Sequence, residues 1–217
     1  MEGVEADTAE ALARLLASAA AEASPASRPE HRFALLLAEA NRFLEERGLG
    51  RIIVTGGYAV ELLTGGVVRT LDVDVIVEGF EAARVLEAAL KRLEEILGLE
   101  RAARGPILPL AGAEKAFDVV SIGYRPRFQP LRVEVPGHGW FYLEAPEELV
   151  LRYLREALYW GTREARLRAL LLLATLLERL DLPGLREAAR GEDERLAKLL
   201  DELVEEARRI IRGQRRS

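Results

Sequence analysis

Apolar residues recur along this chain with two different periods, and these periods predict the order of helices and strands. A helical spacing of apolar residues predicts helices over residues 6–23 and 30–47. The segment SPASRP, residues 24–29, interrupts that pattern and is interpreted as a linker. Gly48 follows the second helix at a position that is typical of a helix C-cap.

Short apolar runs rich in valine and isoleucine then alternate with helical patterns, which indicates an α/β segment. Three strands are expected at residues 52–54, 71–77 and 115–122, with helices between them at 58–63 and 80–97. A hairpin is expected next, with strands 131–135 and 140–143 on either side of the turn-rich tetrapeptide PGHG.

The remainder of the chain has a helical pattern. Helices are expected at 147–160, 163–180 and 192–211, with Pro183-Gly184 and Gly191 interpreted as interruptions and the basic tail as frayed. The predicted organisation is therefore an N-terminal helix and linker (1–29), an α/β core (30–145) and a C-terminal helical region (146–217).

Composition and charge exclude several classes of site. The 217 residues include no cysteine, which excludes disulfides, thiolate zinc sites and cysteine nucleophiles. Only His31 and His138 are available as imidazole ligands, so a histidine-rich metal site is not expected. The net charge of −5 argues against a globally basic nucleic-acid-binding protein.

Nothing in the sequence predicts export or insertion into a membrane. The first residues are acidic, and the longest apolar stretch, residues 169–177, is too short to span a bilayer. We therefore expect a cytoplasmic protein. The charged residues are mostly Arg and Glu, and Asn and Gln are scarce, which fits either a heat-adapted organism or a GC-rich genome.

Two aspartates interrupt the valine-rich strand at 71–77. Side chains two residues apart on a strand share a face, so Asp72 and Asp74 should project together, while Leu71, Val73 and Val75 pack on the other face. Neighbouring carboxylates repel each other, and a positive group should compensate them. The candidates are Arg69 and a bound divalent cation, because hard cations such as Mg²⁺ prefer oxygen ligands.

A third carboxylate and a glycine pair complete the candidate chemistry. Asp118 lies in another apolar run and can face the first two aspartates if the two strands are neighbours; Glu114 is a weaker rival outside that run. Three carboxylates could then hold one or two metal ions. Gly56-Gly57 joins a strand directly to a helix, and a helix N-terminus reached in this way can bind a phosphate.

The order I-V-T-G-G-Y-A, R-T-L-D-V-D-V and F-D-V-V, over roughly residues 50–122, resembles the nucleotidyltransferase fold of the DNA polymerase β-like superfamily. The hairpin, the P-E-E-L helix and the L-D-x-x-x-L stretch at 180–185 look like stand-alone members related to type IV abortive-infection toxins. The resemblance implies a small mixed sheet flanked by helices. It also implies transfer of an NMP from an NTP to a hydroxyl of a protein, an RNA or a small molecule, with release of pyrophosphate.

The resemblance assigns a role to each candidate residue. Asp72 and Asp74 would bind two Mg²⁺ ions, with Mn²⁺ as a substitute, and Asp118 would share one metal and help to activate the incoming hydroxyl. The triphosphate would be bound by the glycine pair and by two residues that precede the aspartate strand, namely Gly56, Gly57, Arg69 and Thr70.

A departure from the toxin-like pattern motivates an alternative. Those relatives carry a lysine after the hairpin and an aspartate on the next helix, whereas this chain has Arg152, Tyr153, Arg155 and the segment 166–168 there. The alternative is a catalytically inactive binding or regulatory subunit, for example of a toxin–antitoxin pair. Assembly with itself or with a partner protein stays open.

Three other groups have competing interpretations. Trp140, Phe141 and Tyr142 could stack on a base, although an alternating aromatic strand is more often part of a core. Arg152 and Arg155 could bind a triphosphate or form a surface ion-pair face with Glu148 and Glu156. His138, in the PGHG turn, is expected to be an exposed loop residue.

Overall fold

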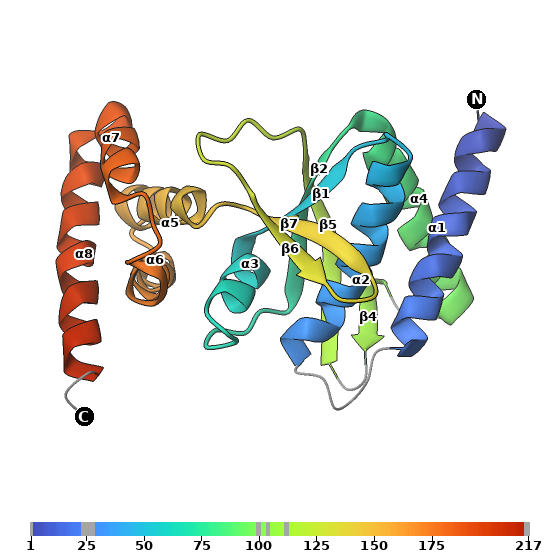
Figure 1. Ribbon diagram of the computed structural model, residues 1–217, viewed down its shortest axis with the longest axis horizontal. Coiled ribbons are helices and arrows are strands. Elements are labelled where there is room, and N and C mark those ends of the chain that lie inside the picture. The colour runs from blue at the N-terminus through green and yellow to red at the C-terminus, as the bar shows by residue number, and fades with distance from the viewer. Residues whose placement is uncertain (1, 23–28, 99–100, 103–104, 111–112, 215–217) are drawn as a thin grey trace. The chain divides into compact units, whose positions relative to one another are not determined.

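The chain folds as two compact units, each with its own secondary structure (Figure 1). The computed structural model describes residues 2–22, 29–98, 101–102, 105–110 and 113–214. Unit 1 consists of Met1–Leu62, Val68–Arg125 and Pro130–Glu144, and unit 2 of Leu63–Val67, Pro126–Gln129 and Ala145–Ser217. The predicted linker at 24–29 lies almost entirely outside the described residues.

Unit 1 is built around a mixed sheet with the strand order β3-β4-β5-β2-β1-β7-β6. Its strands are β1 (Arg51–Thr55), β2 (Asp72–Glu78), β3 (Arg101–Ala102), β4 (Gly105–Leu110), β5 (Ala113–Ile122), β6 (Leu131–Val135) and β7 (Gly139–Leu143). β2 runs antiparallel to β1 and parallel to β5, and β1 runs parallel to β7. The mixed α/β class expected from the sequence is confirmed, whereas β3 and β4 were not predicted.

In the described part of unit 1, four helices accompany this sheet, and their apolar faces contribute to the core. They are α1 (Glu2–Glu22), α2 (Pro29–Glu46), α3 (Gly56–Leu63) and α4 (Phe80–Leu97). α1 packs against α4 and α2 (Figure 1), and Leu16, Leu36, Leu86 and Phe117 from three helices and β5 meet around one small gap. Apolar residues of β1 and β2, such as Ile53 and Val73, are fully buried in this core. The same sheet carries the aspartates.

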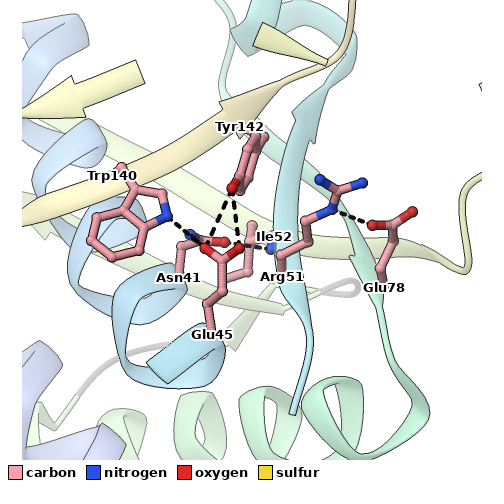
Figure 2. A network of polar contacts seen from close by, with 7 residues as sticks. All are labelled: Asn41, Glu45, Arg51, Ile52, Glu78, Trp140 and Tyr142. Atoms are coloured by element: carbon pink, nitrogen blue, oxygen red, sulfur yellow. Dashed lines mark hydrogen bonds and ion pairs between the residues drawn. The ribbon is translucent and has the colours of Figure 1, made fainter. Parts of the chain in front are cut away.

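Polar contacts attach α2 to the strands β1 and β7 (Figure 2). Asn41 Oδ1 accepts a hydrogen bond from the backbone N–H of Ile52 at 2.7 Å. The Glu45 carboxylate accepts from Trp140 Nε1 at 2.5 Å and from the Tyr142 hydroxyl at 3.1 Å. These two aromatic side chains therefore connect the hairpin to α2, while Phe141 between them is fully buried. Phe141 therefore belongs to the core, whereas Trp140 and Tyr142 are half-buried, and their stacking on a base stays a prediction.

His138 is half-buried and contacts the same helix. Its Nδ1 lies 3.0 Å from Glu39 Oε1, and Glu39 also accepts from Arg42 at 2.5 Å. The expectation that His138 is an exposed loop residue is wrong, because the hairpin turn lies against α2 and the backbone of Gly139 passes close to Arg42.

Unit 2 consists mainly of helices, namely α5 (Pro146–Trp160), α6 (Arg163–Leu176), α7 (Leu182–Glu192) and α8 (Glu194–Gln214). α7 was not predicted, since its sequence contains Pro183, Gly184 and Gly191. The proline stands in the first turn, where its missing N–H is tolerated, and the Asp181 side chain caps the helix by accepting from Gly184 N at 3.0 Å. α8 also continues through most of the tail expected to fray. Among the described helices, none has the length and apolar character that crossing a membrane would require.

The burial of β2 differs from the prediction at one end. Val73 and Val75 are fully buried, as the alternation predicts, but Leu71 lies just before the strand and is 78% exposed. The expectation that Leu71 packs with these valines is therefore wrong, because the strand and its buried face begin only at residue 72.

Candidate functional site

The pairing of β2 with β5 brings two of the three predicted carboxylates side by side. In this parallel pair Asp74 is the register partner of Asp118, and Asp72 is the partner of Ala116. Register partners on neighbouring strands share a face, and so do residues two apart on one strand. Asp72, Asp74 and Asp118 therefore project from the same face of the sheet, as the site hypothesis requires. Asp72 is exposed, and the other two are half-buried.

The glycine pair approaches Asp74 from the other neighbouring strand. Thr55, the last residue of β1, is the register partner of Asp74, and α3 begins at the next residue, Gly56. A Cβ added at Gly56 would lie 2.3 Å from Asp74 Oδ2, and Gly56 has a φ of +63°. Only glycine provides both this conformation and this space without strain. The predicted direct strand-to-helix turn is present and lies against one of the aspartates.

Glu144 is a fourth carboxylate near the three aspartates, and it was not predicted from the sequence. It directly follows β7, whose Leu143 is the register partner of Val54, and it is 3% exposed. Its carboxylate accepts a hydrogen bond from the Thr55 hydroxyl. Glu144 interrupts an apolar run, F-Y-L-E-A, in the same way as Asp118 does, and this was the signal that could have identified it.

The two residues expected to contact phosphates lie immediately before Asp72. Arg69 is exposed. Thr70 is held by its backbone, since its N–H donates to Glu61 Oε2 at 3.0 Å and its carbonyl accepts from Lys115 Nζ. The Thr70 hydroxyl accepts a longer hydrogen bond, 3.4 Å, from the N–H of Asp72. Contact of either residue with a phosphate stays a prediction.

The donor set suits a hard cation in an open site. Among the residues that the structure describes, no group of three or more His, Asp or Glu side chains is arranged to hold a metal ion by itself. The aspartates therefore offer a neighbouring pair, Asp74 and Asp118, with Asp72 on the same face. Mg²⁺ is commonly coordinated by one or two carboxylates together with water and substrate phosphates. The carboxylates of Asp72, Asp74 and Asp118 are of the kind that this coordination requires. The side chain of the rival Glu114 lies outside the described side chains.

Several arginines of the C-terminal region form ion pairs within unit 2. Arg155 binds the Glu192 carboxylate through Nε and Nη2, both at 2.6 Å, and Arg127 binds the same group. The hydrogen bonds from Arg155 are the main cause that lowers the pKa of Glu192 from its ordinary 4.5 to about 2; burial opposes them, and Arg127 lowers the pKa further. Arg155 is thus part of an ion pair whose carboxylate is Glu192, while Glu148, whose charge also acts on Arg155, accepts from the backbone N–H of Phe128 at 3.1 Å.

Comparison with known proteins finds similarity only among solved structures, since no family model and no curated protein matches the chain. One match is the antibiotic-resistance factor ANT(2″)-Ia in solution, with 18% identity, a TM-score of 0.42, and coverage of 73% of this chain and 90% of that one. A crystal structure of ANT(2″)-Ia with adenylyl-2″-tobramycin has 19% identity and a TM-score of 0.36, and covers 81% and 94%. An antigenic nucleotidyltransferase-like protein from Paracoccidioides brasiliensis has 16% identity and a TM-score of 0.48, and covers 78% and 93%.

Proposed function

We propose that this protein is a metal-dependent nucleotidyltransferase. It would transfer an NMP from an NTP to a hydroxyl group of a protein, an RNA or a small molecule. The acceptor oxygen forms a bond to the α-phosphorus, the bond from that phosphorus to the bridging oxygen breaks, and pyrophosphate leaves. The acceptor loses its proton in the same reaction, so a nearby base is needed.

The observation that carries the proposal is the register of β2 and β5. It places Asp74 beside Asp118 and leaves Asp72 on the same face. Adjacent carboxylates on one face repel each other, and a bound divalent cation would offset this repulsion, so the arrangement supports a site for Mg²⁺ or Mn²⁺. When bound, such ions would neutralise phosphate charge and orient the α-phosphate for in-line displacement.

The remaining residues have roles that follow from their positions. The turn at Gly56 and Gly57 lies against Asp74 and opens α3, so backbone N–H groups there would bind the triphosphate beside the aspartates. Arg69 and Thr70 precede Asp72 and would contact the same phosphates. Asp118, half-buried next to Asp74, would accept the proton of the incoming hydroxyl, since a carboxylate next to the reacting centre can act as the base.

The alternative, a catalytically inactive binding or regulatory subunit, is motivated by the C-terminal arginines. Arg155 forms an ion pair with Glu192, and Arg166 forms one with Glu206. These two arginines therefore connect helices of unit 2. A subunit of this kind could bind a nucleotide without transferring it. Binding measured together with turnover separates it from the enzyme.

The decisive experiment measures transfer from each of the four NTPs labelled at the α-phosphate, with Mg²⁺ or Mn²⁺ and with protein, RNA and small hydroxyl compounds as acceptors. We expect Asp72→Asn and Asp74→Asn each to lower metal-dependent transfer by at least about 100-fold, because each removes a charge that positions the metal. Asp7→Asn, at an exposed position on α1, is the matched control and should keep full activity. Unchanged transfer in both aspartate variants contradicts the assignment.

A further inference from the structure

A buried ion pair lies beneath the segment that leads into β2. Lys115 Nζ on β5 lies 2.8 Å from Glu61 Oε2 on α3, and the two side chains are only 5% and 3% exposed. Removing two charges from water is unfavourable unless further hydrogen bonds satisfy them. The partners of this pair therefore show what it holds in place.

Both charged groups bind the backbone of a single residue, Thr70. Glu61 Oε2 accepts from the Thr70 N–H at 3.0 Å, and Lys115 Nζ donates to the Thr70 carbonyl. The ammonium also lies 5.0 Å from the ring centroid of Tyr58 and 5.9 Å from that of Phe33, so two aromatic rings contact the buried cation. We call the set Glu61, Lys115 and the Thr70 backbone the Thr70 clamp.

Hydrophobic packing contributes little to the position of residues 68–71, the segment that contains Thr70. Within residues 68–71, Arg69 is exposed and Leu71 is 78% exposed. Pairing with β5 begins directly after the clamp, where the N–H of Ala116 donates to the Leu71 carbonyl at 2.8 Å. Since Ala116 follows Lys115 and is the register partner of Asp72, the clamp sets where the aspartate strand starts.

We infer that Lys115 and Glu61 are positioning residues of the nucleotide site. By holding both backbone groups of Thr70, they fix the path of residues 68–71 and thereby the placement of Arg69 and Asp72 relative to the triphosphate and metal. Both would act through the Thr70 backbone, which is what their hydrogen bonds contact. This inference rests on the proposed nucleotidyltransferase activity, but the clamp itself can be tested without it.

The test uses the full chain with the double substitution Lys115→Met and Glu61→Leu. An apolar pair of similar volume avoids a buried unpaired charge, so the protein should fold. We expect the Thr70 amide to exchange its hydrogen faster, because it loses its acceptor. We also expect kcat/KM for metal-dependent transfer to fall by about 100-fold, the effect of a small misplacement of binding groups. The Mg²⁺ concentration for half-maximal rate should rise.

Arg51→Met is the matched control. It breaks the ion pair between Arg51 of β1 and Glu78 of β2. Glu78 is the last residue of β2, so this pair lies at the end of the strand opposite to the Thr70 clamp. With side chains 31% and 27% exposed, this pair controls for the loss of an ion pair at β2 but not for the loss of buried charge. Thr70 exchange and the Mg²⁺ dependence should stay as in the wild type. Glu61→Gln, which keeps an acceptor for the Thr70 N–H, should retain most of the Thr70 protection.

Each outcome decides a separate point. Unchanged Thr70 exchange in the double variant overturns the clamp. Faster exchange with unchanged kcat/KM and Mg²⁺ dependence overturns the positioning role while leaving the proposed activity intact. A wild-type protein that neither binds nor transfers any nucleotide contradicts the proposed function and the positioning role with it, and the exchange measurement then still decides the clamp.

Discussion

At the scale of single residues, Gly56 has the most constrained environment of the candidate site. Its φ of +63° is unfavourable for other residues, and a Cβ there would meet three atoms of Asp74: Oδ2 at 2.3 Å, Cγ at 3.2 Å and Cβ at 3.3 Å. The Asp74 Cβ is fixed by the strand, so only rotation of the carboxylate can relieve the contact. The glycine therefore controls the direction of a predicted metal ligand.

We expect Gly56→Ala to abolish metal-dependent transfer and to weaken Mn²⁺ binding, measured by calorimetry, because the Asp74 carboxylate turns away. Stability should fall by about 1–2 kcal/mol from the left-handed backbone alone. Gly65→Ala is the control, with a similar φ of +67° and no atom within 4 Å of the added Cβ. It should show a similar loss of stability in urea unfolding and keep its activity. Equal activity in the two variants argues against the close approach of Gly56 to Asp74.

At the scale of elements, one carboxylate holds three parts of unit 2 together. Glu192 at the end of α7 binds Arg155 of α5 and Arg127 of the segment Pro126–Gln129. Arg155 is the main cause of the lowered pKa of Glu192, about 2. Protonation of this single group should therefore loosen α7 from α5.

The sign of the pH effect follows from that pKa. Because the pKa of Glu192 is lower in the folded protein, its contribution to stability is present above pH 4.5, the ordinary pKa of the group, and is lost as the pH falls towards 2. We expect Glu192→Gln to flatten the dependence of the free energy of unfolding on pH in this window, measured by urea titration. Glu194→Gln, on the neighbouring helix with a long 3.7 Å contact to Arg190, should leave the slope as in the wild type. A wild-type slope in Glu192→Gln would contradict the ion pair in solution.

At the scale of the whole molecule, the candidate metal and phosphate residues all belong to unit 1. Gly56 and Gly57 come from its first segment, and Arg69, Asp72, Asp74 and Asp118 from its second. Binding of a metal–nucleotide complex should therefore stabilise the folded protein through unit 1.

We expect Mg²⁺ with the preferred NTP to raise the free energy of unfolding by about 2.7 kcal/mol when the complex is present at a hundred times its Kd. Calorimetric unfolding measures this, and removal of the metal with EDTA should abolish most of the gain. Asp74→Asn should show little gain under the same conditions, whereas Asp7→Asn should match the wild type. A gain of equal size in Asp74→Asn would place the bound nucleotide elsewhere on the protein.

The local pattern of the sequence was sufficient to predict most elements and the aspartate-bearing face. Apolar patterns identified β1, β2, β5, the β6–β7 hairpin, and α1 to α6 and α8, because the spacing or clustering of their apolar residues is visible in the chain. It missed α7, since Pro183 and Gly184 are usual helix breakers and only their place in the first turn beside the Asp181 cap makes them acceptable. Strands β3 and β4 were also missed.

The tertiary structure alone decided which groups meet. The register of Asp74 with Asp118, the contact of Gly56 with Asp74, the hydrogen bond from Thr55 to Glu144 and the Thr70 clamp all join residues from different elements. Strand pairing and register depend on how whole faces pack, and no local spacing encodes the partner of a strand. The sequence by itself determined that Asp72 and Asp74 share a face, because a period of two residues is a property of the strand alone.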